Sequence, residues 1–147
     1  MIALLQRVKE ASVQVDRQTV GEIKHGLLIL LGISVHDTEK EAGWLAKKVA
    51  NLRIFSDGEG KMNRSLIEVS GEALVISQFT LLAEISTGNR PSYIKAARPE
   101  QANPLYVAFV AQVESILGQP VKTGVFGADM QVSLVNDGPV TVWVESK

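Results

Sequence analysis

The stretch 26-GLLILLGI-33 says most about the fold, because it is continuously apolar over the length of one strand. Such a run is typical of a strand that is buried on both faces. On its N-terminal side, 2-IALLQRV-8 and 11-ASVQV-15 are predicted as two strands. A turn at residues 16–18 and a short strand near residues 20–23 are expected between them and the apolar stretch.

A helix is predicted after the apolar stretch. Thr38 and Glu41 fit a capping box, in which each side chain satisfies the free backbone N–H of the other residue. Apolar residues then recur at helical spacing and form one face: Ala42, Leu45, Val49 and Leu52. The segment 56-SDGEG-60 is predicted as a turn, and 73-ALVISQFTLL-82 as a strand.

The segment 83–101 lacks clear periodicity and is the longest irregular region, and long loops inside compact domains are often functional. A second helix is predicted to begin with Asn103 as its cap and Pro104 at its first position. Gly118 and Pro120 end it. Its predicted buried stripe comprises Leu105, Ala108, Phe109, Val113, Ile116 and Leu117.

Further strands are predicted near residues 121–126, 129–135 and 140–144. Between the last two lies Asn136-Asp137-Gly138-Pro139, a run of turn formers that ends in a residue unable to donate to a sheet ladder. On pattern alone this run is a hairpin turn.

The predicted order of strands, helix, strand, helix and strands is not the alternation of a doubly wound sheet. We therefore expect a single α+β domain over residues 1–147, with a mostly antiparallel, barrel-like sheet covered by two main helices. The composition, 46% apolar and 21% charged, is typical of a globular protein. No apolar run approaches the roughly 20 residues of a membrane span.

Composition also restricts the chemistry. The absence of cysteine excludes disulfides, thiolate nucleophiles and cysteine metal sites, and it suits the cytoplasm. No signal peptide is expected at the N-terminus. His25 and His36 have no metal-ligand spacing, and neither a GxSxG elbow nor a phosphate-binding glycine loop occurs. The net charge of −1 gives no indication of a long nucleic-acid footprint.

Three features remain as candidate sites. In 77-SQFTL-81, strand alternation places Gln78 and Thr80 on one face and Ser77 and Phe79 on the other, either as a site or as a solvated edge strand. The loop 88-GNRPSY-93 and the residues after it contain Arg90, Lys95 and Arg98, which either hold a phosphate or are ordinary surface charge. Phe126 precedes a glycine and is either core or a contact for a planar ligand. These residues alone do not identify a reaction.

Taken together, SQFTL at 77–81 and NDGPVT at 136–141 resemble the two signature motifs of the D-aminoacyl-tRNA deacylases, the D-tyrosyl-tRNA(Tyr) deacylase family. The MIALLQRV start, the GNRPSY loop and the FGADM turn fit the same family. The resemblance implies hydrolysis of the ester that joins a D-amino acid, or glycine, to the 3′-terminal adenosine of tRNA. It also implies a homodimer that needs no metal or cofactor, in which a cis Gly138-Pro139 pair of one subunit projects into the site of the other.

The catalytic residues implied by the resemblance are Ser77, Gln78, Phe79 and Thr80. An aminoacyl ester is reactive, so orientation, a placed water and stabilisation of the oxyanion are sufficient. We expect the ribose 2′-hydroxyl of the substrate to position or activate that water, and backbone N–H groups near Phe79 and Thr80 to bind the oxyanion. The alternative is Thr80 as nucleophile, for which no motif supplies a base.

The remaining roles also follow from the resemblance. We expect the Gly138 and Pro139 carbonyl groups to bind the α-amino group and to crowd the position of an L side chain. Phe126 is expected to pack against the terminal adenine, and Arg7 to fix the Gly-Pro pair. Phosphates near the tRNA end are assigned to three cations: Arg90, Lys95 and Arg98. The competing interpretations are a non-catalytic module that binds the tRNA 3′ end, a small amino-acid esterase, and a purely structural dimer.

Overall fold

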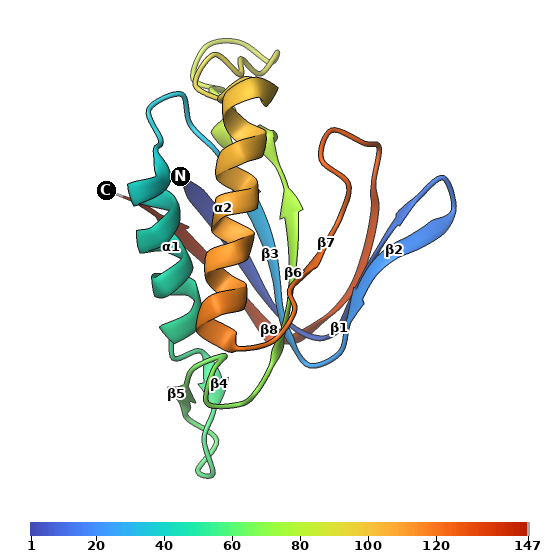
Figure 1. Ribbon diagram of the computed structural model, residues 1–147, viewed down its shortest axis with the longest axis vertical. Helices are drawn as coiled ribbons and strands as arrows, with labels where there is room; N and C mark the ends of the chain where they lie inside the picture. The colour runs from blue at the N-terminus through green and yellow to red at the C-terminus, as the bar shows by residue number, and fades with distance from the viewer. Residues whose placement is uncertain (147) are drawn as a thin grey trace.

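The sheet is organised around one long strand, β1 (Ile2–Val15), in the computed structural model, which describes residues 1–146 (Figure 1). The first half of β1 pairs with β3 (Gly26–Gly32) and its last residues pair with β2 (Gln18–Ile23), both antiparallel. Along its other side, β1 pairs antiparallel with β8 (Gln131–Glu145). The two strands predicted at 2–8 and 11–15 are therefore one continuous strand.

The apolar stretch forms β3, and the prediction that both of its faces are buried is confirmed. Leu27, Leu28 and Ile29 are each no more than 1% exposed. β3 lies between β1 and β6 (Glu72–Ser77), to which it is parallel, and the two-residue β7 (Lys122–Thr123) is parallel to β6. The sheet is thus mixed, and the strand predicted over residues 121–126 is shorter than expected.

The sheet curls until its two ends nearly meet, in agreement with the predicted barrel-like shape. Gly21 of β2 lies so close to β7 that an added Cβ would be 2.6 Å from the Thr123 carbonyl oxygen. The curl encloses a small apolar cluster of Val8, Ala11, Val13, Ile23, Leu28, Leu74 and Ile76. Figure 1 shows this curl on the side of the sheet away from the helices.

Two helices that run in the same direction cover the other face of the sheet and bury the larger part of the core (Figure 1). The first is α1 (Glu39–Asn51), and its capping box between Thr38 and Glu41 is confirmed. The second is α2 (Pro99–Leu117), which ends at Gly118 in the left-handed conformation, as predicted. The single-domain α+β architecture with two main helices matches the expected fold class. No helix within residues 1–146 is both long and apolar enough to span a membrane.

The predicted start of the second helix is wrong. α2 begins at Pro99 rather than at Asn103, and Pro104 lies inside the helix. A proline at the first helical position loses nothing, because its missing N–H would have had no partner there. Pro104 is still close to the N-terminal end and removes one hydrogen bond of the ladder. The remaining elements, β4 (Phe55–Ser56) and β5 (Met62–Arg64), form a hairpin around the predicted turn.

Candidate active site

A pocket of about 580 Å³ opens where β6 ends and α2 begins. The end of β6 and the turn after it contribute Ser77, Gln78 and Phe79 to its lining, and the turn before β8 contributes Phe126. The remaining wall comes from β3, from the segment that leads into α2, and from the start of β8: Leu31, Ile33, Ile76, Tyr93, Ala96, Ala97, Arg98, Pro99, Ala102, Gly127, Ala128, Met130 and Val132. The fold therefore brings together five of the predicted site residues from three separate segments of the sequence: Ser77, Gln78, Phe79, Arg98 and Phe126.

The SQFTL segment is a turn at its second half, not a strand. The Gln78 N–H donates to the Leu31 carbonyl at 2.8 Å, as the last bond between β6 and β3. Because β3 ends at Gly32, the chain has no ladder partner beyond this point, and residues Phe79–Leu82 form a 3₁₀ turn. The strand predicted over residues 73–82 consequently stops at Ser77.

This turn leaves two backbone donors free, one on Phe79 in the pocket wall and one on Thr80 beside it. Within residues 1–146, neither the Phe79 N–H nor the Thr80 N–H donates to another residue. The first N–H groups of a helical turn have no partner inside the turn, so they can bind a ligand oxygen. Phe79 itself lines the pocket, and its side chain is 56% exposed.

The side chains of Gln78 and Thr80 contact each other, with the Gln78 amide donating to the Thr80 hydroxyl oxygen. Strand alternation predicts that these two residues share one face of a strand. In the structure they lie next to each other because the chain forms a 3₁₀ turn. Thr80 does not line the pocket, whereas Gln78 does. An amide cannot accept a proton, so the contact gives the Thr80 hydroxyl no general base.

Two aromatic pairs border the pocket. Phe79 meets Tyr93 edge to face, with ring centroids 5.0 Å apart, and Phe126 packs against Tyr106 with centroids 5.8 Å apart. The Tyr106 hydroxyl donates to the Val75 carbonyl at 2.8 Å, and burial raises the pKa of Tyr106 to about 12. Tyr106 was missed in the sequence, although a tyrosine inside an apolar helical stripe signals a buried hydroxyl that needs a partner.

The Gly138-Pro139 pair lies in a bulge of one long strand, and the predicted hairpin turn is wrong. β8 pairs with β1 both before and after the pair, from Gln131 to Glu145. The register shifts opposite Arg7, so the residues around Gly138 and Pro139 leave the ladder and are exposed. The peptide bond between them is cis, as the resemblance implied. Neither residue lines the pocket of its own chain.

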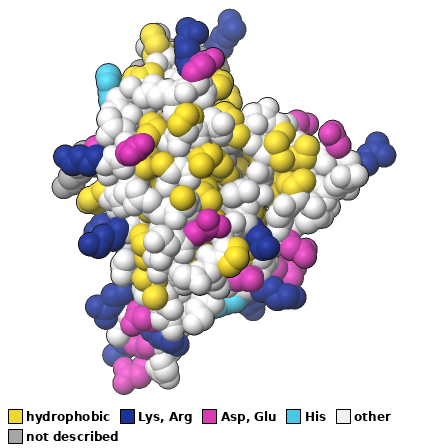
Figure 2. Space-filling view, in the orientation of Figure 1, with side chains coloured by type: hydrophobic (Ala, Val, Ile, Leu, Met, Phe, Trp, Pro, Cys, Tyr) yellow, Lys and Arg dark blue, Asp and Glu magenta, His cyan; other side chains and the backbone are white. Residues whose placement is uncertain are grey.

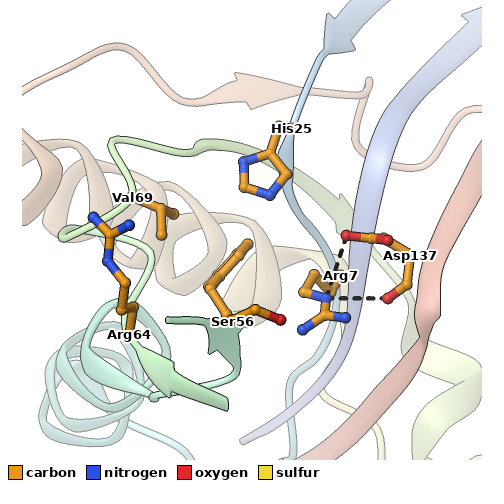
Figure 3. A pocket seen from close by; sticks show the side chains of 7 residues that line it. Arg7, His25, Ser56, Arg64, Val69 and Asp137 are labelled. Carbon is orange, nitrogen blue, oxygen red and sulfur yellow. Dashed lines mark hydrogen bonds and ion pairs between the residues drawn. The ribbon is translucent and has the colours of Figure 1, made fainter. Parts of the chain in front are cut away.

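Arg7 holds this bulge from within the protein. Its Nε donates to the Asp137 carbonyl at 3.0 Å and lies 3.6 Å from an Asp137 carboxylate oxygen, while its Nη1 donates to the Ile54 carbonyl at 2.7 Å. Figure 3 shows Arg7 and Asp137 joined in this way. They border a separate cavity of about 300 Å³ that is also lined by His25, Phe55, Ser56, Arg64 and Val69.

The two ends of the bulge are tied to β1 by side chains. The Asn136 amide donates to the Gln6 side-chain oxygen at 2.8 Å, and the Thr141 hydroxyl donates to the same oxygen. The Val140 N–H donates to the Asn136 side-chain oxygen at 3.3 Å. The residues of the NDGPVT motif that flank the Gly-Pro pair therefore fix the conformation of the bulge.

Within the described residues, the three cations assigned to phosphates have different surroundings and share no contact. Arg98 lines the pocket and precedes the first residue of α2. The Lys95 ammonium pairs with the Glu84 carboxylate at 2.6 Å, and this hydrogen bond is the largest cause that lowers the pKa of Glu84 to about 2. Arg90 is exposed in the loop between Glu84 and Lys95. Only Arg98 belongs to the pocket wall.

Neither histidine forms part of a metal site in the structure. His25 packs edge to face on Phe55 at 5.2 Å, and His36 is exposed. Across residues 1–146, no three side chains of His, Cys, Asp or Glu cluster in a way that could hold a metal ion.

Comparisons with known proteins agree on one family. The model of a protein family described as "D-Tyr-tRNA(Tyr) deacylase" matches residues 4–145. The chain is 58% identical to a D-aminoacyl-tRNA deacylase of Cytophaga hutchinsonii and 57% identical to one of Chromobacterium violaceum. Both alignments cover 100% of this chain and 98% of the relative.

Solved structures give the same fold. A structure titled "c-Myc DNA Unwinding Element Binding Protein" superposes with a TM-score of 0.94 at 41% identity, covering 100% of this chain and 99% of that one. A probable eukaryotic D-amino acid tRNA deacylase superposes with a TM-score of 0.82 over 97% of both chains, and its 17% identity makes this a likeness of fold alone. The match to this family model and the full-length relatives confirm the interpretation of the two motifs: the chain belongs to the D-Tyr-tRNA(Tyr) deacylase family.

Proposed function

We propose that this chain is a carboxylic ester hydrolase that cleaves D-aminoacyl-tRNA to free tRNA and a D-amino acid, and so removes residues of the wrong chirality. The observation that carries the proposal is the 3₁₀ turn at the pocket, which presents the unpaired N–H groups of Phe79 and Thr80. The full-length relatives that are named D-aminoacyl-tRNA deacylases support the substrate class.

The pocket suits the 3′-terminal adenosine of the substrate. Two aromatic rings that line the pocket, Phe126 and Phe79, offer apolar surface to a planar base. The ester carbonyl then lies at the 3₁₀ turn, where the two N–H groups stabilise the oxyanion that forms when water attacks. Water adds to the carbonyl carbon, the bond to the ribose 3′-oxygen breaks, and that oxygen leaves with a proton.

The water is positioned by the 2′-hydroxyl of the substrate rather than by a protein base. Thr80 receives a hydrogen bond from the Gln78 amide, which cannot take its proton. We therefore expect Thr80→Ala to keep most of its turnover in a single-turnover deacylation assay. Loss of essentially all turnover in a folded Thr80→Ala protein that still binds a substrate analogue would make Thr80 the nucleophile.

Discrimination between D and L residues is assigned to Gly138 and Pro139 of a second subunit. Both residues are exposed and lie outside the pocket of their own chain, which supports a role at the pocket of another copy. β8 has no partner on its outer edge within the described chain, and it exposes Leu134, Val135 and Trp143, which fits a dimer contact. The carbonyl groups of Gly138 and Pro139 bind the α-amino group of the substrate and exclude an L side chain. Glycine has no side chain to exclude, so glycyl-tRNA is also accepted.

Mixing two inactive variants tests the shared site. We expect Phe126→Glu, which blocks the pocket, and Gly138→Val, which disrupts the bulge, each to be inactive alone. After random exchange of subunits, about a quarter of wild-type turnover should return, because half of the dimers are mixed and each has one intact site. Mixed dimers detected by native mass spectrometry without any gain in turnover would rule out the shared site.

A comparison of substrates separates the rival functions. The enzyme should release D-amino acids and glycine from tRNA, leave L-aminoacyl-tRNA intact, and cleave a simple D-amino-acid ester slowly. Equal cleavage of the simple ester would indicate a small amino-acid esterase, and binding without ester loss would indicate a module that binds the tRNA 3′ end. We assign the enzyme to the cytoplasm, which suits a chain without cysteine.

A further inference from the structure

The exposed side of α1 and the segment after it form a hollow that is separate from the pocket. Its volume is about 750 Å³, and no residue lines both the hollow and the pocket. We call it the α1 surface, and the residues used in the argument are Trp44, Lys47, Lys48, Arg53 and Ile54. In Figure 2, dark-blue basic side chains project along the edge of the molecule where α1 lies.

The α1 surface is cationic in a chain whose net charge is −1. Three of its lining residues are basic, and none is acidic. Within residues 1–146, Lys47, Lys48 and Arg53 form no ion pair. The Arg53 guanidinium donates to Asn63, a neutral partner, and its charge is a minor cause of the lowered pKa of the exposed Glu68 carboxyl. Cations that are not held in ion pairs attract an anionic partner.

Trp44 adds an exposed aromatic face to these charges. Its side chain is 42% exposed, while the apolar face of α1 formed by Leu45 and Val49 is fully buried. The Lys48 ammonium lies 5.5 Å from the Trp44 ring centroid. A tryptophan beside a lysine one turn away is an ordinary helix-surface pair, but here Lys47 and Arg53 line the same hollow. An aromatic platform among unpaired cations is the arrangement that binds single-stranded nucleic acid.

The α1 surface is physically tied to the Gly-Pro bulge. Ile54 lines the surface, and its carbonyl accepts the hydrogen bond from Arg7. The same guanidinium holds the Asp137 carbonyl, one residue before Gly138. If Gly138 and Pro139 reach the pocket of the second subunit, the α1 surface of the donating subunit accompanies them toward the substrate bound there.

We propose that the α1 surface binds the RNA part of a substrate held in the pocket of the other subunit. Trp44 stacks on an unpaired base near the 3′ end, and Lys47, Lys48 and Arg53 contact the phosphates. This inference rests on the proposed function, because it assigns a second contact to the same substrate. It gives the enzyme a physical reason to prefer aminoacyl-tRNA to a small ester.

The test compares two substrates, D-aminoacyl-tRNA and the D-aminoacyl ester of adenosine, which lacks the RNA chain. We expect the double variant Lys47→Glu/Lys48→Glu to lower kcat/KM on the tRNA at least about tenfold, mostly through KM, since contacts to phosphate dominate affinity for nucleic acids. Trp44→Ala should lower it at least about fivefold, as expected for one stacked base, with partial rescue by Trp44→Phe. Neither variant should change kcat/KM on the adenosine ester.

Matched controls and salt dependence separate RNA binding from a structural effect. Lys122→Glu, on β7, makes the same charge change as Lys47→Glu but lies outside the α1 surface, so it should leave both substrates unaffected. In the double variant, the slope of log kcat/KM for tRNA against log salt should flatten by about two, one for each lost phosphate contact. Equal losses on both substrates, or an unchanged slope, would overturn the proposal.

A competition experiment identifies the class of partner. Single-stranded RNA should inhibit cleavage of the tRNA substrate more strongly than polyglutamate of the same charge, and Trp44→Ala should remove the difference. If polyglutamate inhibits equally well in the wild type, the surface attracts any anion and the proposal is wrong. A wild-type protein that cleaves neither substrate would instead refute the proposed function, so the two failures are distinguishable.

Discussion

Arg7 is a buried cation whose guanidinium joins segments that are far apart in the sequence. Its contact with Asp137 spans 130 positions and its contact with Ile54 spans 47. A guanidinium presents several donors in one plane, and a lysine ammonium cannot reach both carbonyls in the same geometry. Gly138 depends on the same neighbourhood: its φ is 130°, and an added Cβ would lie 2.9 Å from a Val140 methyl carbon.

We predict that Arg7→Lys lowers the free energy of unfolding by about 2 kcal/mol, because hydrogen bonds to charged groups contribute about 1.5–3 kcal/mol each. Turnover should fall at least about tenfold, since small displacements of positioning groups are costly. Urea unfolding and deacylation assays measure the two effects. Arg17→Lys, at an exposed turn, is the matched control and should change neither quantity.

The Glu84 carboxylate gives a prediction about pH. Its pKa is lowered to about 2, first by the hydrogen bond from Lys95 and then by those from Ser86. A lowered pKa means that the ionised form is favoured in the folded protein, so the link to Lys95 is complete above the ordinary value of 4.5 and is lost as pH falls toward 2. Carboxyl NMR should show a titration midpoint near 2. In Lys95→Met the midpoint should rise, and a midpoint near 4.5 in the unmodified protein would contradict the ion pair.

At the scale of elements, the ends of strands decide where the site lies. β6 turns away at Ser77 because β3 offers no further partner, and the resulting turn exposes the donors of Phe79 and Thr80. β3 and β6 approach each other closely at their other end. A Cβ on Gly26 would lie 1.9 Å from the Glu72 carbonyl oxygen.

We therefore predict that Gly26→Ala destabilises the protein by at least about 3 kcal/mol, the upper part of the range for overpacked positions. Glu72 contributes backbone rather than a flexible side chain at this contact, so the clash cannot be relieved locally. Gly58→Ala is the control, because a Cβ there meets nothing within 4 Å. Equal unfolding midpoints of the two variants in urea would show that β3 and β6 can move apart freely.

At the scale of the whole molecule, the pocket and the Gly-Pro bulge occupy separate places on one chain. The proposed role of Gly138 and Pro139 therefore calls for a second copy, and the edge of β8, which is unpaired within the described residues, is the surface that we expect it to use. Association coupled to folding makes stability depend on protein concentration.

We predict that the thermal unfolding midpoint rises with protein concentration and that turnover per chain falls on dilution below the dissociation constant of the dimer. Analytical ultracentrifugation over the same range should show the dimer dissociate as turnover is lost. Constant turnover per chain in samples shown to be monomeric would mean that one chain holds a complete site.

The sequence by itself determined the features that depend on neighbouring residues. Apolar continuity predicted the burial of β3, cap chemistry predicted the start of α1 and the end of α2, and the paired motifs identified the family. Only the tertiary structure decided where β6 stops, why NDGPVT is a bulge and not a hairpin, and which cations share a hollow. Those outcomes depend on partners far away in the chain. A local pattern records whether a side chain faces water or core, but not which strand lies beside it or where that strand ends.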